Sequence, residues 1–258
     1  MTYTPLRFFL VLVLPLLWDA CSKEEVIPAA EEREDTHLLS QDYVIAHRGF
    51  WNKKDAPQNS RAAFDRALEF RFYGVEFDVR QTIDGELVIC HDADFGGMII
   101  EKSTYNELCA SRLANGETIP LLEDFLSIRR KADTQVKLII DIKKCSIVDL
   151  VHLIEEYDLQ DAVIYITFTK GYCHQLAELD YGANTYYSNN GTTPEDIKEY
   201  GFGGVCYRYT FLDENSELVV DASSLGIGIM VWTVNNPKKV HDYSVEKIYV
   251  ITDAPEEF

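Results

Sequence analysis

The stretch that decides the fold is GVEFDVRQTIDGELVICHD, residues 74–92. It holds two apolar runs, 74–79 and 86–90, separated by RQTIDG, which is too short to cross over between parallel strands. The dipeptide Asp84-Gly85 is a strong signal for a two-residue β-hairpin turn. With those turn residues, Asp78 lies opposite His91 and the two side chains share one face. We therefore expect 86–90 to fold back on the strand 74–79.

From Tyr43 onward, short apolar runs alternate with longer helical patterns such as 60–70 and 146–157, the first of which Asn59 or Ser60 can cap. Such alternation predicts a parallel sheet with right-handed crossovers. Without the hairpin arm, eight strands remain, which is the number in a TIM barrel. We predict an α/β fold, a TIM (β/α)8 barrel with a β-hairpin arm after strand 2 and no large insertion domain. Its strands are expected at 43–46, 74–79, 137–142, 163–168, 183–187, 203–207, 227–232 and 247–251.

The composition limits the classes of partner. The 258 residues carry 43 acidic and 24 basic side chains, a net charge of −19. This balance argues against nucleic acid as a partner, because phosphates are bound by Lys and Arg. It also argues against electrostatic adhesion to anionic membranes. The six cysteines form no CxxC pair, so we expect neither a structural zinc site nor a disulfide framework.

The N-terminal residues predict export. Residues 1–20 hold one arginine before an apolar stretch that is too short to span a bilayer, as in a secretory signal. The following Cys21 resembles the lipidated cysteine of bacterial lipoproteins, and SKEE after it resembles the export signal of some surface lipoproteins. We expect a signal peptide (1–20), an acidic tether (21–40) and a barrel (41–258). The protein is then an exported lipoprotein at the outer membrane or cell surface, with membrane contact through this anchor only.

Carboxylates gather where two predicted strands end. Glu76 and Asp78 are two residues apart and share a face, while Val75 and Phe77 take the other face, toward the helices. Asp141 ends the run LIIDIK and completes a possible three-carboxylate site for a divalent cation. Oxygen ligands favour magnesium or calcium over zinc. An ion pair between Asp141 and Lys143 is an equally good interpretation of that run.

The same rim of the barrel receives further polar residues. His47 and Arg48 follow the first strand, Trp232 ends the seventh, and the hairpin returns His91 to this level. Barrel enzymes place their catalytic groups at the C-terminal ends of the strands. Two imidazoles that move protons beside a cation that polarises phosphate indicate phosphoryl chemistry. Trp232 either packs in the core or lines the substrate, and its place at the rim favours the lining role.

The ordered motifs resemble those of the glycerophosphodiester phosphodiesterase family. They are AHRGFW (46–51), QNS (58–60), GVEFDV (74–79), DGELVICHD (84–92), IPLLEDFL (119–126), LIIDIK (138–143), VWTVN (231–235) and VITDAP (250–255). The resemblance covers residues 43–258. It implies a TIM barrel that uses a divalent cation, Ca²⁺ or Mg²⁺, to cleave glycerophosphodiesters into glycerol 3-phosphate and an alcohol.

The resemblance also implies roles for individual residues. His47 and His91 would be the acid–base pair, with the assignment of acid and base left open. Glu76, Asp78 and Asp141 would bind the metal, and Arg48 and Lys143 would hold phosphate oxygens. In the family, the glycerol 2-hydroxyl can attack phosphorus, and water then opens the cyclic phosphate.

The chain departs from the family pattern in four places. Gln58 stands where a glutamate is common, and Asp141 replaces a longer glutamate. The segment 91–108 lacks Arg-Thr-Thr after His-Asp, and the loop from His91 to the next barrel strand is short. Two alternatives therefore remain beside the hydrolase. One is a catalytically weak surface barrel that binds phosphate-bearing ligands, and the other is a phospholipase that acts on intact lipid.

Overall fold

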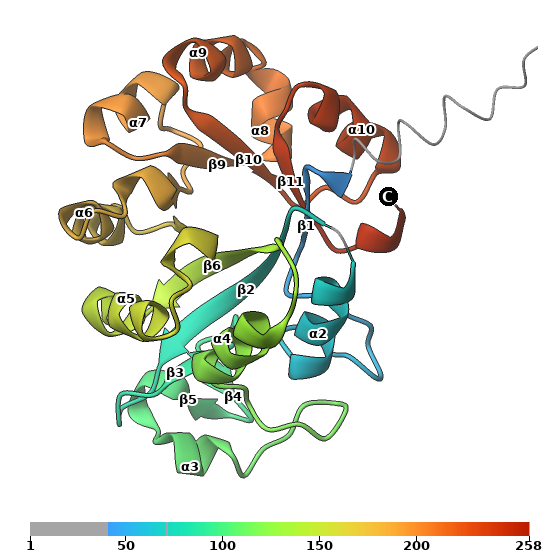
Figure 1. The fold of residues 1–258 in the computed structure, drawn as a ribbon, viewed down its shortest axis with the longest axis vertical. Helices are drawn as coiled ribbons and strands as arrows, with labels where there is room; N and C mark the ends of the chain where they lie inside the picture. Colours follow the sequence, from blue (N-terminus) through green and yellow to red (C-terminus); the bar gives the residue numbers. More distant parts are fainter. Residues whose placement is uncertain (1–40, 71, 258) are drawn as a thin grey trace, which may run out of the picture.

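Eight parallel strands close into a barrel in the computed structural model, which describes residues 41–70 and 72–257 (Figure 1). Their order is β1-β11-β10-β9-β8-β7-β6-β2, and pairing of β1 with β2 closes the ring. The eight strands predicted from the alternation are all present. Their bounds are β1 Val44–Ala46, β2 Gly74–Gln81, β6 Lys137–Lys144, β7 Val163–Thr167, β8 Thr185–Tyr187, β9 Gly204–Arg208, β10 Gly228–Trp232 and β11 Tyr249–Thr252.

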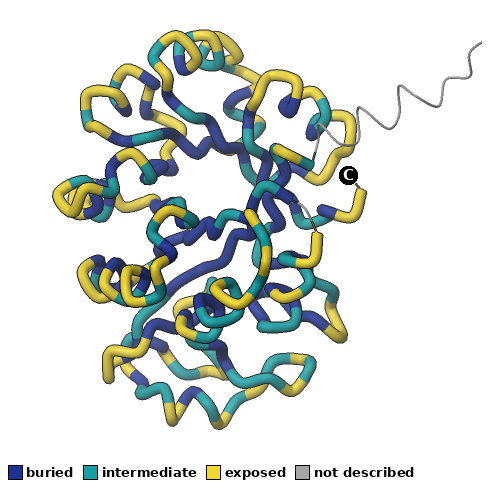
Figure 2. Tube along the Cα trace, viewed as in Figure 1, coloured by how far each residue is buried: buried dark blue, intermediate teal, exposed yellow. Residues whose placement is uncertain are grey.

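Helices connect the strands and cover the outside of the barrel, so the strands are buried and the outer helix surfaces are exposed (Figure 2). Short 3-10 turns precede β7 and β8 and follow β11. The α-helices are α2 Arg61–Glu69, α4 Leu122–Lys131, α5 Ile147–Glu156, α6 Lys170–Glu178, α7 Pro194–Tyr200, α8 Tyr209–Glu214, α9 Glu217–Leu225 and α10 Pro237–Val245. Among the described residues, no helix is long and apolar enough to cross a membrane.

Local sequence explains where the predicted helices begin. Ser60, one of the two predicted caps, accepts a hydrogen bond from the amide of Ala63 at the start of α2, and Ser146 caps α5 in the same way. The apolar face of α2 then packs inward, where Phe64 stacks on Phe125 of α4 with ring centroids 4.2 Å apart. These contacts fix the loop before α2, which belongs to the candidate site.

Strand alternation separates the outer core from the barrel interior. On β2, Val75 and Phe77 are fully buried in the core between strands and helices, as predicted. Glu76 and Asp78 take the alternate positions and therefore point inward. Apolar residues from the other strands fill the interior, namely Ile45, Ile139, Ile166, Tyr186, Cys206, Met230 and Ile251.

A tyrosine ring fills the N-terminal end of this interior. Tyr186 packs against Gly204 and Gly228, the first residues of β9 and β10. A Cβ atom at Gly204 would lie 2.2 Å from a ring carbon of Tyr186, so these positions require glycine. Tyr73 and Tyr249 stack nearby with centroids 4.1 Å apart. The interior is therefore packed with side chains at this end.

The hairpin arm is present, but its predicted turn is wrong by one residue. β3 (Leu87–Ile89) pairs antiparallel with β2 through Val79↔Ile89, so the loop holds three residues, 83–85. The amide of Thr82 donates to the carbonyl of Glu86 over 2.9 Å, and Gly85 takes a φ of 93°. This closure makes Cys90, rather than His91, the neighbour of Asp78 across the ribbon: the Cys90 amide donates to the Asp78 carbonyl over 3.0 Å.

A small unit follows the arm. Two short strands, β4 (Asp94–Phe95) and β5 (Met98–Ile99), form a hairpin that continues into a 3-10 turn, η1 (Ile100–Lys102), and the one-turn helix α3 (Tyr105–Leu108). The sequence patterns did not predict these elements. Four buried residues form an apolar cluster of their own: Val88, Ile100, Leu108 and Ile119. The excursion from the barrel is thus short, in agreement with the predicted absence of a large insertion domain.

Candidate active site

A pocket of about 220 Å³ opens at the C-terminal ends of the strands. It gathers nearly all the predicted site residues. Its lining is His47, Arg48, Glu76, His91, Asp141, Lys143, Ile166, Phe168, Ser188, Cys206, Trp232, Thr233 and Ile251. A larger hollow, about 750 Å³, lies at the N-terminal ends of β1, β2 and β6, beside Tyr73 and Lys137. None of the predicted site residues lines that hollow, so the chemistry belongs to the smaller pocket.

Three buried carboxylates meet on one side of the pocket. Glu76 and Asp78 come from β2 and Asp141 from β6, where Asp78 and Asp141 are direct register partners. Oxygen atoms of all three lie within 4.8 Å of one another. The residues are only 3%, 1% and 9% exposed. Ionised carboxylates this close and this buried repel one another, so the group needs positive charge.

Two cations and an amide supply part of that compensation. The Lys143 ammonium lies 2.6 Å from Asp141 Oδ2 and 3.1 Å from Asp78 Oδ1. The predicted ion pair therefore forms alongside the carboxylate group and does not replace it. Arg48 Nε approaches Asp78 Oδ2 at 3.4 Å, and the Asn59 side-chain amide donates to the same oxygen over 2.7 Å. Asp78 is thus held from three sides.

The compensation is incomplete, and the donor set fits a divalent cation. Asp141 Oδ1 is buried without a hydrogen-bond partner. Burial and the charge of Asp78 raise the pKa of Glu76 to about 8. An unpartnered carboxylate oxygen beside a carboxylate that resists ionisation indicates missing positive charge. Oxygen-only ligands suit Mg²⁺ or Ca²⁺. Glu76, Asp78 and Asp141 are therefore the residues that would hold the ion.

His47 is oriented by an acidic partner. Its Nδ1 lies 2.7 Å from Asp253 Oδ1, and its Nε2 lies 3.9 Å from Glu76 Oε2. Asn235 holds Asp253 in turn, because the Asp253 amide donates to its side-chain oxygen over 2.9 Å. Burial lowers the pKa of His47, but the Asp253 hydrogen bond and the charges of Glu76 and Asp253 outweigh it and leave the pKa raised.

The backbone after His47 is bent sharply toward the carboxylates. Arg48 has a φ of 57° and Gly49 a φ of 85°, in the left-handed region that non-glycine residues rarely adopt. This bend lets the Arg48 amide donate to Glu76 Oε2 over 2.8 Å. A Cβ atom at Gly49 would lie 2.8 Å from the backbone of Ala63, so the close approach of α2 requires glycine. Strain of this kind concentrates at functional sites.

His91 follows the arm and stands at the mouth of the pocket. Its side chain is 42% exposed, and its Nδ1 lies 2.8 Å from Asp92 Oδ1. The Arg80 guanidinium donates to the His91 carbonyl over 3.0–3.1 Å and pairs with Glu101 at 2.7 Å. The chain after β3, rather than the ribbon register, brings His91 into the pocket.

The opposite side of the pocket is mostly apolar. Phe168 follows β7, and Trp232 ends β10, with their rings edge to face and centroids 5.7 Å apart. Ile166 and Ile251 line the deeper part. Phe168 is 52% exposed, so a large apolar side chain stands at the mouth beside charged groups.

Comparison with known families identifies the barrel. Residues 47–257 match the Glycerophosphoryl diester phosphodiesterase family. The chain belongs to this family. The earlier resemblance is thereby confirmed, and the family uses a divalent metal, in agreement with the acidic group on β2 and β6.

Solved and curated relatives agree with the assignment. A crystal structure of a glycerophosphodiester phosphodiesterase from Parabacteroides distasonis is 34% identical, with a TM-score of 0.79 over 83% of this chain and 94% of that one. An Oleispira antarctica phosphodiesterase in complex with the product sn-glycerol-3-phosphate shares the fold at 21% identity, with a TM-score of 0.73 over 83% of this chain and 94% of that one. A curated Caldanaerobacter subterraneus glycerophosphodiester phosphodiesterase is 33% identical over 144 residues, 48% of this chain and 57% of that one. A Mycobacterium tuberculosis relative is 32% identical over 133 residues, 49% and 48% of the two chains. The chain therefore spans about half the length of these two curated relatives.

The structure places the predicted catalytic, metal-binding and phosphate-binding residues of this family member at one end of the barrel. Their individual roles stay predictions. Asp78 lies directly beside the pocket lining, while the predicted lipidation site Cys21, with the signal and tether (1–40), lies outside the described residues. Sequence reasoning missed Asp253 as the partner of His47 and Asn59 as a partner of Asp78. Both positions carried a signal, since Asp253 follows a strand and Asn59 lies in a quoted motif.

Proposed function

We propose that this protein hydrolyses glycerophosphodiesters to glycerol 3-phosphate and an alcohol, with a divalent cation, Mg²⁺ or Ca²⁺, at Glu76, Asp78 and Asp141. The observation that carries the proposal is the undercompensated carboxylate group, which lies beside His47 in one pocket in a member of this family. A cation bound there would polarise the phosphate and neutralise charge that develops on it.

Arg48 and Lys143 hold the phosphate in this proposal. Both cations line the pocket and already contact Asp78, so their positions are fixed before substrate arrives. Arg48 also donates from Nη1 to Gln58 Oε1 over 2.9 Å. The neutral amide of Gln58 orients the guanidinium without cancelling its charge. Preorganised donors of this kind stabilise a developing negative charge more than water does.

His47 acts as the base and His91 as the acid in this proposal. Asp253 accepts the Nδ1 proton of His47, which leaves Nε2 free to take a proton from the glycerol 2-hydroxyl as that oxygen bonds to phosphorus. The bond from phosphorus to the alcohol oxygen breaks, and His91 at the mouth supplies the proton that the alcohol carries away. Water then opens the cyclic phosphate, and the two histidines exchange roles. The position of Asp253 behind His47 supports this assignment, as in other acid–base triads.

The test is release of glycerol 3-phosphate by the purified protein from a series of glycerophosphodiesters, with Mg²⁺, with Ca²⁺ and with chelator. We expect release that depends on the cation and stops with chelator. Absence of release with either cation, from a protein shown to be folded, contradicts the proposal. Binding of phosphate esters without turnover would then favour the weak binding barrel, and release from phospholipid vesicles alone would favour the phospholipase.

We also propose that the protein is exported and lipidated at Cys21, so that the acidic segment 21–40 tethers the barrel to a membrane. The support is the sequence of residues 1–40. Mass spectrometry of the protein from a membrane fraction is expected to show cleavage before Cys21 and acyl mass on that residue. An N-terminal peptide of unmodified mass, or one that retains residues 1–20, contradicts the proposal.

A further inference from the structure

An arginine stands over the aromatic side of the pocket. Arg208 ends β9 and is the direct register partner of Trp232 on β10. Its guanidinium carbon lies 5.4 Å from the centre of the Trp232 ring, within the range of a cation–π contact. The amide of Arg208 donates to Asn190 Oδ1 over 3.1 Å, which fixes the backbone at this point. The guanidinium thus lies over the ring of a residue that lines the pocket.

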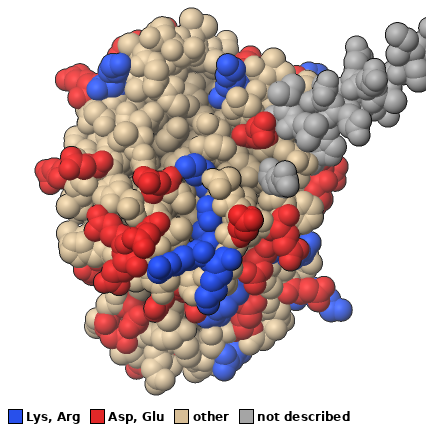
Figure 3. All heavy atoms as spheres, in the orientation of Figure 1, with Lys and Arg blue, Asp and Glu red and all other residues tan. Residues whose placement is uncertain are grey.

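The charge of Arg208 is not neutralised by a carboxylate. Within residues 41–70 and 72–257, none of the ion pairs involves this side chain, which is exposed. By contrast, Arg48 and Lys143, which line the pocket, both contact the Asp78 carboxylate. Acidic side chains occur in several places on the face that Figure 3 shows, and the chain has a net charge of −19. An exposed, unpaired cation over Trp232, at the edge of the pocket, is available to a charged ligand.

The alcohol part of the substrate is the part that reaches this arginine. The glycerol 2-hydroxyl must approach both phosphorus and His47, which places the compact glycerol beside the charged strands β1, β2 and β6. The alcohol varies in size and departs to solvent, so it occupies the open mouth. In the order of the strands, β9 lies across the barrel from β1 and β2, which position His47 and Glu76.

The aromatic rings of Trp232 and Phe168 already have cations beside them. Bare Trp and Phe rings bind quaternary ammonium groups well. In this pocket Arg208 lies over the Trp232 ring, Phe168 packs edge to face on it, and the Lys143 ammonium lies 5.7 Å from the Phe168 centroid. A choline group would meet these like charges, whereas a carboxylate or phosphate on the alcohol would meet unpaired positive charge.

We infer that Arg208 sets the charge preference for the departing alcohol, so that glycerophosphodiesters with an anionic alcohol are favoured over those with a cationic one. The inference rests on the proposed hydrolase function and adds a substrate class to it. An exposed charge contact of this kind changes kcat/KM by a factor of roughly two to three. Attraction of one ester and repulsion of the other together give about three- to tenfold.

The test compares kcat/KM for three esters of glycerol 3-phosphate, whose alcohols are glycolate, ethylene glycol and choline. The measured quantity is the glycolate-to-choline ratio, which cancels general effects of a variant on folding or chemistry. Arg208→Gln is expected to lower this ratio about three- to tenfold, and Arg208→Lys to keep most of it. Added salt is expected to lower the ratio of the parent protein toward that of Arg208→Gln, because exposed charges are screened.

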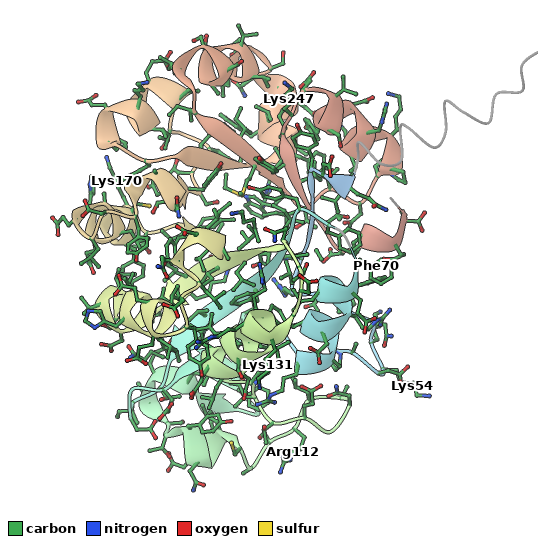
Figure 4. All side chains as sticks on the ribbon, in the orientation of Figure 1. Lys54, Phe70, Arg112, Lys131, Lys170 and Lys247 are labelled. Carbon is green, nitrogen blue, oxygen red and sulfur yellow. The ribbon has the colours of Figure 1, made fainter. Side chains whose placement is uncertain are left out.

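Lys131→Gln is the matched control. It makes the same change in net charge at the last residue of α4, labelled in Figure 4, on an exposed side chain that does not line the pocket. It is expected to leave the ratio unchanged. An unchanged ratio in Arg208→Gln, an equal loss in Lys131→Gln, or the same loss in Arg208→Lys overturns the inference while the hydrolase function stands. Hydrolysis of none of the esters by the parent protein overturns both.

Discussion

The two sides of the pocket are built differently. On the charged side, formed by β1, β2, β6 and the arm, the functional side chains are held by polar contacts, and Asp78 alone meets Lys143, Arg48 and Asn59. On the apolar side, Phe168 and Trp232 contact each other and a cation through their rings only. Phe168 is more than half exposed, whereas the three carboxylates are buried.

This contrast indicates that the two sides of the pocket have different functions. A buried charge network keeps its geometry only if every member is compensated, because an uncompensated buried charge costs several kcal/mol. Lys143, Arg48 and Asn59 compensate part of the charged side, and a bound cation would compensate the rest. This side is therefore suited to chemistry that is common to all substrates. Ring contacts at an exposed rim tolerate substitution at small cost. The apolar side is therefore the place where one barrel can differ from another in the substrates it accepts.

The largest expected effect comes from removing one carboxylate of the charged side. Asp141→Asn changes a proposed cation ligand whose Oδ1 has no hydrogen-bond partner, so the variant is expected to bind Mg²⁺ or Ca²⁺ more weakly. Because a bound cation contributes several kcal/mol to phosphoryl chemistry, kcat/KM is expected to fall roughly a thousandfold. Kinetics at several cation concentrations and calorimetric titration of the cation measure the two effects.

Asp133→Asn is the control for that experiment, since this exposed aspartate lies just before the other end of β6. It is expected to keep the activity and cation affinity of the parent protein. Unchanged cation affinity in Asp141→Asn would place the third ligand elsewhere.

The second prediction concerns His47 and the hydrogen bond that it makes with Asp253. His47→Ala is expected to lose about 10²–10⁴-fold in kcat/KM, as for other general bases, and Asp253→Asn to lose less. The Asp253 hydrogen bond and charge raise the pKa of His47 against the opposing effect of burial. Without them the pKa falls, so the base is free of its proton at lower pH. The acid limb of the kcat/KM profile is therefore expected to move to lower pH in Asp253→Asn. A limb that stays in place would show that His47 does not control it.

The third effect is on stability without the cation. Burial and the charge of Asp78 raise the pKa of Glu76 to about 8, above the ordinary 4.5, so the folded protein keeps a proton that the unfolded chain releases. Stability therefore falls as the pH rises from about 4.5 through about 8. A bound cation opposes this loss, so the rise in Tm that Mg²⁺ or Ca²⁺ produces is expected to be larger at pH 9 than at pH 6. Each kcal/mol corresponds to about 2–4 °C in a protein of this size.

Glu76→Gln separates this effect from general pH sensitivity. The variant has no carboxyl proton to keep, so its metal-free Tm is expected to fall less between pH 6 and pH 9 than that of the parent protein. Equal cation-induced shifts at both pH values in the parent protein would mean that Glu76 does not resist ionisation.

The sequence predicted the charged side better than the apolar side for a physical reason. Buried strands require apolar residues, so Glu76, Asp78 and Asp141 stand out at strand ends where a charge needs a partner. Their meeting then follows from parallel strands that end at one rim. An aromatic residue such as Phe168 at a strand end fits a core equally well, and the sequence alone does not show that it faces solvent.

Features that depend on a single tertiary contact could not be predicted from the sequence. The arm was predicted, but its register follows from the bond between Thr82 and Glu86, which makes the loop three residues long. Asp253 supports His47 from 206 positions away in the chain, and only closure of the barrel between β1 and β11 brings the two together. Both depend on tertiary geometry, which composition and periodicity do not encode.

The smallest effect tests the apolar side directly. Phe168→Ala removes a half-exposed ring that contacts Trp232 and the Lys143 ammonium but no carboxylate. An aromatic contact of this kind contributes about 0.5–1.5 kcal/mol, so KM is expected to rise about two- to tenfold while kcat changes less. The rise should differ between alcohols, because the ring lies where the alcohol departs. Steady-state kinetics on two esters with alcohols of different size measure this. A loss confined to kcat and equal for both esters would instead mean that Phe168 acts through Lys143, and the two sides would then work as one unit.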